Sequence, residues 1–186
     1  MGAGPPEEGI GPGLDGARSF NARARAVTDV GHLPPEDVQT YPRPPALEPV
    51  PHRIKVVLGG RIITDTEKAL RVLETHHAPT YYIPREDIAA QLFPAHGRSH
   101  CEWKGTARYF DVRVDGRSAK KAAWTYDAPT TAFAALAGHV AFYAGKMDRC
   151  SVGGVLVEPQ PGDFYGGWTT PNLTGIVKGG PGTRHW

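Results

Sequence analysis

The sequence predicts a mainly β fold with short helices, of the α+β class. Short apolar runs with a period of two dominate residues 46–158, dipeptides typical of tight turns separate them, and helical periodicity is confined to short stretches between them. The chain has 186 residues, which is enough for one ordinary domain with appendages. We therefore expect small antiparallel sheets connected by short helices.

The predicted domain opens with a β-hairpin. Ile54, Val56 and Leu58 alternate with the intervening positions, as in a strand with one buried face. Gly59-Gly60 then provides a two-residue turn, and residues 61–64 return as the partner strand.

The pattern changes after this hairpin and predicts a short helix. Residues 66–74 place Ala69, Leu70 and Leu73 on one helical face, and a polar residue is available as the N-cap. Pro79 follows, so the helix is expected to end before it.

Further elements alternate along the rest of the domain. A second short helix is predicted over residues 84–92, because a proline followed by acidic residues is typical of a first helical turn. A third helix is predicted over 129–137, and Asp115-Gly116 is a strong hairpin turn. The remaining predicted strands cover residues 80–83, 100–103, 106–114, 119–126, 139–143 and 155–157.

Composition divides the chain into three zones. Residues 1–45 are rich in proline and glycine and poor in large apolar side chains, so we expect a disordered or extended arm. Residues 46–158 form the predicted domain. Residues 159–186 are rich in glycine but carry several large aromatic rings, including Trp186, which predicts an irregular extension that packs on the domain or on a second subunit.

Charge and targeting signals narrow the function classes. The 21 basic and 19 acidic residues leave a formal charge of +2, which does not support a nucleic-acid or anionic-membrane partner. No apolar run approaches the roughly 20 residues that a membrane helix needs, and the start lacks the pattern of a signal peptide. We therefore expect a cytoplasmic protein.

Lys104 and Cys101 are the first candidate site residues. Lys104 precedes Gly105, where the backbone can approach a ligand closely, so its ammonium could bind a carboxylate or phosphate or act as a base when desolvated. The alternative is a surface lysine, or a structural ion pair with Glu74. Cys101 becomes a nucleophile if Lys104 stabilises its thiolate, but a buried structural cysteine is the simpler interpretation.

Glu74 is the candidate acid. It ends the predicted helix, where the helix dipole is unfavourable for a carboxylate. This placement indicates an inward role, either as a general base or as the partner of Lys104 or Arg71. The alternative is an ordinary solvated glutamate.

Aromatic residues on the predicted strands complete a candidate ligand pocket. Trp124 and Tyr126 share one face of their strand because side chains alternate. Rings with polar groups at their edges are typical of ligand sites, although some of them must be core. The candidate ligand-binding residues are Tyr82, Trp103, Tyr109, Trp124 and Tyr126.

The sequence predicts no metal site and no cofactor. Structural zinc requires paired Cys-x-x-Cys or equivalent histidine ligands, whereas Cys101 and Cys150 are isolated. The histidines His76-His77, His96 and His100 are interpreted as loop residues rather than as ligands.

Several motifs occur together in the order found in a known family. They are Glu74, Pro79, Tyr81-Tyr82 and Pro84, Cys101-x-Trp103-Lys104-Gly105-x-Ala107-x-Tyr109, Ala123-Trp124-x-Tyr126-x-x-Pro129, and Ala141-Phe142-Tyr143. With these motifs the chain resembles the DUF427 family over residues 50–160. The resemblance implies the β-tent fold, in which two small antiparallel sheets meet at an angle, here without zinc knuckles. The tail motif from Glu158 to Trp168 is similar to that of a bacterial branch, and the resemblance implies no activity.

Three hypotheses for the function follow. The first is a small-molecule-binding module with a polar and aromatic pocket for an unidentified ligand. The second is an enzyme that acts on a small metabolite through Glu74 and Lys104, or through Cys101. The third is a protein-interaction module that uses the N-terminal arm and the C-terminal tail, with a homo-oligomer formed through the tail.

Overall fold

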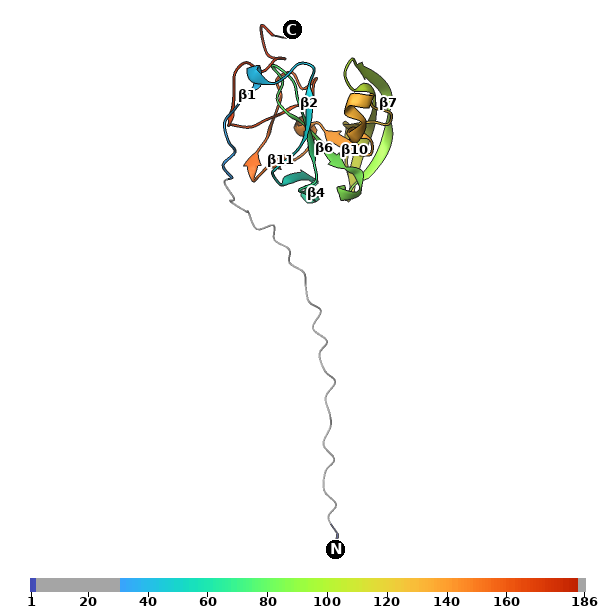
Figure 1. Cartoon of the computed structure of the whole chain (residues 1–186). Coiled ribbons are helices and arrows are strands. Elements are labelled where there is room, and N and C mark those ends of the chain that lie inside the picture. The colour runs from blue at the N-terminus through green and yellow to red at the C-terminus, as the bar shows by residue number, and fades with distance from the viewer. Residues whose placement is uncertain (3–30, 184–186) are drawn as a thin grey trace.

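Figure 1 shows the computed structural model of the chain, which describes residues 1–2 and 31–183. Strands dominate these residues, and the helices are short, which confirms the predicted mainly β class with minor helical content. No helix in the described part is long and apolar enough to cross a membrane.

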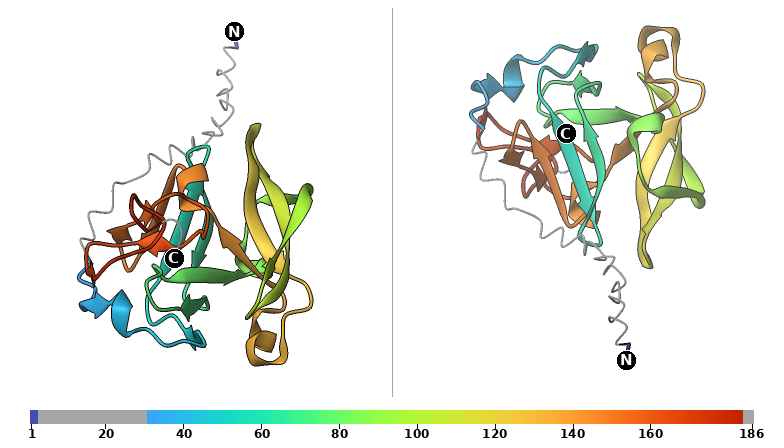
Figure 2. Two further views of the ribbon diagram at one scale, coloured as in Figure 1. Left: turned by 90° about the horizontal axis from the view of Figure 1, so that it is seen from above. Right: turned by 90° about the horizontal axis from the view of Figure 1, so that it is seen from below.

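The larger sheet has seven strands, and every neighbouring pair is antiparallel. Its three longest strands form a curved meander, and Figure 2 shows this meander standing apart from the rest of the fold and joined to it through β6 and β10. In spatial order the strands are β2 (Ala46–Pro49), β5 (Leu70–Leu73), β6 (Thr80–Pro84), β10 (His139–Phe142), β9 (Arg117–Tyr126), β8 (Gly105–Val114) and β7 (Gln91–Cys101).

The second sheet has four antiparallel strands, and two pairs of very short strands complete the fold. The four strands are, in order, β12 (Val155–Leu156), β11 (Arg149–Val152), β3 (Ile54–Leu58) and β4 (Arg61–Thr66). The short pairs are β1 (Glu36–Asp37) with β15 (Leu173–Thr174), and β13 (Glu158–Pro159) with β14 (Trp168–Thr169). The 3₁₀ helices are η1 (Val38–Thr40), η2 (Arg85–Asp87), η3 (Thr131–Leu136) and η4 (Ala144–Lys146).

Both predicted hairpin turns are present. Gly59-Gly60 joins β3 to β4, and Asp115-Gly116 joins β8 to β9. Gly59, Gly60 and Gly116 have positive φ angles, and Asp115 does too, as these two-residue turns require. The alternation seen in the sequence sends Ile54, Val56 and Leu58 into the core, where none of them is exposed.

The helix predicted over residues 66–74 is wrong. Leu70–Leu73 forms strand β5, which lies between β2 and β6 and pairs with both. These pairings are with residues distant in sequence, so the local helical spacing of Ala69, Leu70 and Leu73 could not reveal them. Glu74 therefore follows a strand, and the helix-dipole argument for its inward role no longer applies.

Three other predicted boundaries also change. The helix predicted over 84–92 is a single 3₁₀ turn, η2, after which the chain enters β7 at Gln91. The strand predicted over 100–103 is the end of β7, and residues 102–104 form the turn to β8. The helix predicted over 129–137 is the 3₁₀ helix η3.

The main core lies between the two larger sheets. It is built from side chains of β3 and β4 on one side and of β6, β8 and β10 on the other, all of them buried. Large members of this cluster are Ile54, Leu58, Ile63, Ile83, Phe110, Val112 and Phe142.

The described part of the predicted N-terminal arm is packed rather than extended. Val38 is fully buried, Tyr41 is 8% exposed, and both contact Leu73 in a small apolar cluster. Arg71 forms an ion pair with Glu36 at 2.9 Å. These few apolar residues of the predicted arm find partners on β5 and the C-terminal segment. Residues 3–30 of the predicted arm lie outside the described residues.

The C-terminal segment, defined here as residues 158–183, packs on the domain. Trp168 is completely buried, with its ring centroid 5.1 Å from that of Tyr81. Its indole N–H donates to the Phe142 carbonyl at 2.9 Å, and its backbone N–H donates to the Pro79 carbonyl at 2.8 Å. Gly166 adopts a φ of 71°, and a Cβ there would come 2.2 Å from the Trp124 ring. Trp186 lies outside the described residues.

The close approach of Gly166 to Trp124 predicts a large loss of stability for Gly166→Ala. Gly116→Ala is the matched control, because Gly116 also has a positive φ but has open space where a Cβ would lie. The control should lose about 1–2 kcal/mol from the left-handed backbone alone. The Gly166 variant should lose about 1–3 kcal/mol more through overpacking, measured by chemical denaturation. Equal losses would contradict this packing.

Candidate functional site

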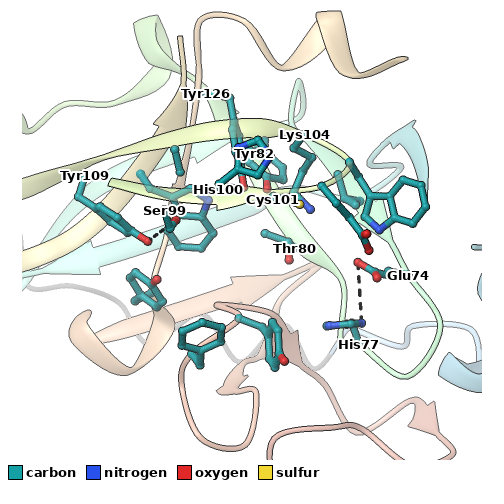
Figure 3. Close-up of a pocket in the computed structure, with 18 of the residues that line it drawn as sticks. Glu74, His77, Thr80, Tyr82, Ser99, His100, Cys101, Lys104, Tyr109 and Tyr126 are labelled. Atoms are coloured by element: carbon teal, nitrogen blue, oxygen red, sulfur yellow. Dashed lines mark hydrogen bonds and ion pairs between the residues drawn. The ribbon is translucent and has the colours of Figure 1, made fainter. Parts of the chain in front are cut away.

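A cavity of about 290 Å³ lies between the β5–β6 loop, the β7–β8 turn, β9 and the C-terminal segment. Figure 3 shows Lys104 of the turn and Cys101 at the end of β7 on one side of it, while Glu74, His77 and Thr80 border it from the facing side. All of the site residues predicted from the sequence line this one cavity, namely Glu74, Tyr82, Cys101, Trp103, Lys104, Tyr109, Trp124 and Tyr126.

Four aromatic side chains form the apolar wall. Trp124 and Tyr126 point the same way from β9, and Tyr82 of β6 lies 6.4 Å and 6.3 Å from their ring centroids. Tyr143, just after β10, lies 4.5 Å from Trp124. Burial raises the pKa of Tyr82 and of Tyr126 above the ordinary value. Their phenols therefore stay protonated and can donate hydrogen bonds near neutral pH.

The β7–β8 turn is held by the loop after β9. The backbone N–H of Thr130 donates to the Lys104 carbonyl at 3.3 Å, and the Thr130 hydroxyl donates to the Trp103 carbonyl. Gly105 has a φ of 96°, which favours glycine, and a Cβ at this position would lie 3.4 Å from the Ala128 carbonyl oxygen. These contacts fix the backbone of the turn, from which the side chains of Lys104 and Trp103 reach the cavity.

The carboxylates of the site are paired with Arg43. Glu74 is only 14% exposed in its side chain, and its Oε1 lies 3.8 Å from Nη1 of Arg43. Glu102 is more exposed, and its Oε1 accepts from Nη2 of Arg43 at 3.2 Å. Within the described residues, Lys104 makes no ion pair with Glu74, and Arg71 pairs with Glu36 and Glu48 instead. The pairing of Glu74 with Lys104 or Arg71 that we predicted is therefore not found.

His77 is a site residue that the sequence analysis missed, because we interpreted His76-His77 as loop histidines. It is 9% exposed, and its Nδ1 lies 3.1 Å from the Thr75 carbonyl. A carbonyl can only accept, so this contact places the proton of the neutral ring on Nδ1 and leaves Nε2 as the basic nitrogen. The Nδ1 atom also lies 4.0 Å from Oε2 of Glu74 (Figure 3).

The environment of His77 favours its neutral form. Burial lowers the pKa of His77 below the ordinary 6.5, and the positive charges of Lys178 and Lys104 lower it further. The carboxylate of Glu74 and the Thr75 carbonyl act in the opposite direction. The net direction is downward, so His77 is neutral at neutral pH.

The C-terminal segment adds three lining residues that the sequence analysis also missed. Phe164 and Tyr165 border the cavity, and the Tyr165 ring meets His77 edge-on at 4.8 Å between centroids. Lys178 borders it too, with Nζ 4.5 Å from the Tyr165 ring centroid. The aromatic content of the tail was a signal that it packs, but nothing in the local sequence marked Lys178.

The two cysteines have different surroundings. Cys101 is half-buried and lines the cavity, whereas Cys150 lies in the core, where burial raises the pKa of its thiol to about 12. Both are free thiols. Among the described residues there is no group of three or more His, Cys, Asp or Glu side chains arranged to hold a metal ion.

Comparison with known proteins places the domain in a family. A family model described as "Domain of unknown function (DUF427)" matches residues 46–153, more than half of the chain. That range contains all of the site residues predicted from the sequence, whereas Arg43, Phe164, Tyr165 and Lys178 lie outside it. A search of the curated proteins finds no match. The chain is a member of the DUF427 family.

Proposed function

We propose that this protein binds a small organic molecule in the cavity beside β9. The observation that carries the proposal is the convergence of the aromatic wall with the polar groups of the β7–β8 turn on one cavity of about 290 Å³. Ligand pockets typically span about 300–1,000 Å³, are lined by apolar and aromatic groups and contain a few polar groups. A volume at the lower limit of that range favours a ligand the size of a small metabolite.

An unpartnered donor supports this proposal. Nε1 of Trp103 is buried and has no hydrogen-bond partner among the described residues. Leaving such a group unsatisfied costs about 1–3 kcal/mol, so an acceptor on a bound ligand would recover that free energy.

The fold is compatible with this proposal. Two larger antiparallel sheets that share one core agree with the β-tent arrangement implied by the family resemblance. A cytoplasmic location and a bacterial origin stay predictions from the sequence. The hypothesis of an interaction module through the arm and the tail stays a prediction, to which Trp168 does not contribute because it is buried within its own chain.

A second candidate function is acid–base catalysis on the bound molecule. It is favoured by the pair of Glu74 and His77, which lie 4.0 Å apart at the cavity. Neutral His77 presents Nε2 as a base, and the nearby carboxylate would stabilise the imidazolium formed when it takes a proton. We therefore propose this chemistry for Glu74 with His77, and the predicted pair of Glu74 with Lys104 stays an alternative. Cys101 stays an alternative nucleophile.

Filling the cavity should abolish binding without unfolding the protein. Thr80→Phe introduces a ring at a residue that lines the cavity, whereas Thr106→Phe makes the same change at an exposed residue of β8. We expect compounds in a small-metabolite library to raise the melting temperature and quench the tryptophan fluorescence of the wild type and of Thr106→Phe, but not of Thr80→Phe. Unaltered responses in a folded Thr80→Phe protein would show that the cavity is not the binding site.

Catalysis through Glu74 should be sensitive to Glu74→Gln. The matched control is Glu102→Gln, because Glu102 also contacts Arg43 but is 64% exposed in its side chain. If the protein is an enzyme, consumption of a metabolite mixture followed by NMR should fall about 10²-fold or more in the Glu74 variant and persist in the control. Equal rates in the two variants would rule out Glu74 as the catalytic carboxylate.

The lowered pKa of His77 can be tested without a ligand, through the pH dependence of stability. Because the pKa of His77 is lower in the folded state than the ordinary 6.5, the unfolded state binds more protons below that pH. His77 should therefore contribute stability above about pH 6.5 that is lost as the pH falls. Between about pH 7.5 and pH 5, the melting temperature of the wild type should fall more than that of His77→Gln. Parallel falls would mean that His77 titrates normally.

A further inference from the structure

We infer that the ligand carries an anionic group, a carboxylate or a phosphate, held between Lys104 of the family domain and Lys178 of the C-terminal segment. This inference rests on the proposed binding function and adds the chemical class of the ligand. It also gives the C-terminal segment a role in recognition.

The first step is the charge balance of the cavity. Its two carboxylates, Glu74 and Glu102, both contact Arg43, and Glu74 has His77 as a further neighbour. Lys104 and Lys178 line the same cavity, and neither makes an ion pair with a carboxylate of the described residues. Arg43, Lys104 and Lys178 thus give the cavity three positive charges against two carboxylates, and the two lysines have no carboxylate partner among the described residues.

The second step is the placement of Lys178. Its backbone N–H donates to the His76 carbonyl at 2.8 Å, and its own carbonyl accepts from Nε2 of Gln160 at 3.0 Å. Its Nζ lies 4.5 Å from the centre of the Tyr165 ring, which is itself set against His77. Because the backbone is anchored on both sides and the ammonium rests on a ring, Lys178 is directed by the fold rather than by a charged partner.

The third step is the matching position of Lys104. Its Nζ lies 6.0 Å from the centre of the Phe133 ring, so it too borders an aromatic face while it reaches the cavity. Lys104 and Lys178 line the same cavity, and the Tyr165 ring beneath the Lys178 ammonium meets His77 edge-on. Two half-buried cations on one cavity form a binding site for an anionic group.

The fourth step concerns the rest of the ligand. Beyond the lysines the cavity is bordered by Trp124, Tyr126 and Tyr143, whose rings form one continuous wall. A flat apolar or aromatic body would bury its surface against these rings while its anionic end meets the lysines. The complete ligand is therefore a small aromatic or apolar acid, or the corresponding phosphate.

The inference is tested with three probes of similar size, phenyl phosphate, benzoate and the neutral benzyl alcohol. Their dissociation constants are measured by amide NMR titration of the full chain. Lys104→Met and Lys178→Met remove one cation each from the cavity, and Lys68→Met is the matched control because Lys68 is 72% exposed in its side chain and lies outside the cavity. Lys178→Arg retains the charge and controls for local misfolding.

We expect at least one anionic probe to bind the wild type about 10-fold or more tightly than benzyl alcohol does, and each cavity variant to weaken that probe about 10-fold, which corresponds to about 1.4 kcal/mol. Lys68→Met should bind like the wild type, and Lys178→Arg should retain most of the affinity. The stronger of the two anionic probes distinguishes a carboxylate ligand from a phosphate.

Three results would overturn the inference. If benzyl alcohol binds as tightly as the anionic probes, the anionic class is wrong while a binding cavity remains. If Lys104→Met or Lys178→Met binds the anionic probes normally, the position of the anionic group between the two lysines is wrong. If none of the three probes shifts the amides of cavity residues, the anionic class is also wrong, and the proposed function then depends on the separate metabolite screen with Thr80→Phe.

Discussion

The burial of Trp168 holds together the parts of the molecule from which the cavity is built. Its indole N–H and its backbone N–H bond to carbonyls of Phe142 and Pro79, which belong to β10 and to the loop before β6. A large ring without any exposed surface contributes several kcal/mol through apolar burial, and its two hydrogen bonds fix its orientation. Because Trp168 is anchored to the larger sheet, the residues just before it, including Gly166, are brought onto the face of Trp124.

This anchoring explains how a site with two unlike sides arises in one small domain. The aromatic side belongs to the larger sheet, where strand pairing sets the relative positions of Tyr82, Trp124 and Tyr126. Four charged or basic side chains of the site belong to loops, a turn and the tail, which lie outside the strands and helices, namely Glu74, His77, Lys104 and Lys178. They are placed by specific backbone bonds, such as those of Thr130 to the β7–β8 turn and of Lys178 to His76. A rigid apolar wall with polar groups on connecting segments is a common arrangement for ligand recognition.

Local chemistry explains which features the sequence could predict. Gly59-Gly60 and Asp115-Gly116 define their hairpins through φ angles that few other residues adopt, so both turns were predicted correctly. The helix predicted over residues 66–74 failed because its strand is defined by partners distant in sequence. The aromatic site residues were found because strand alternation places them on shared faces. His77 and Lys178 were missed because only the folded chain brings a loop and a distant tail to the same cavity.

Part of the cavity is formed by residues that lie beyond the range matched by the family model. The match ends at residue 153, yet Gly166 lies against the Trp124 ring, and Trp124 is only 5% exposed although it also lines the cavity. Without the segment around Gly166, part of the Trp124 ring would be exposed to water. This exposure would cost about 25 cal/mol of stability for each Å² of apolar surface. Only a residue without a Cβ allows the backbone this close to the ring. The segment that covers the Trp124 ring at Gly166 is also the one that carries Lys178 to the cavity. Stability therefore depends on the tail, and under the proposed function ligand recognition depends on it too, so a DUF427 domain with a different tail would retain the aromatic wall but present different charges at the cavity.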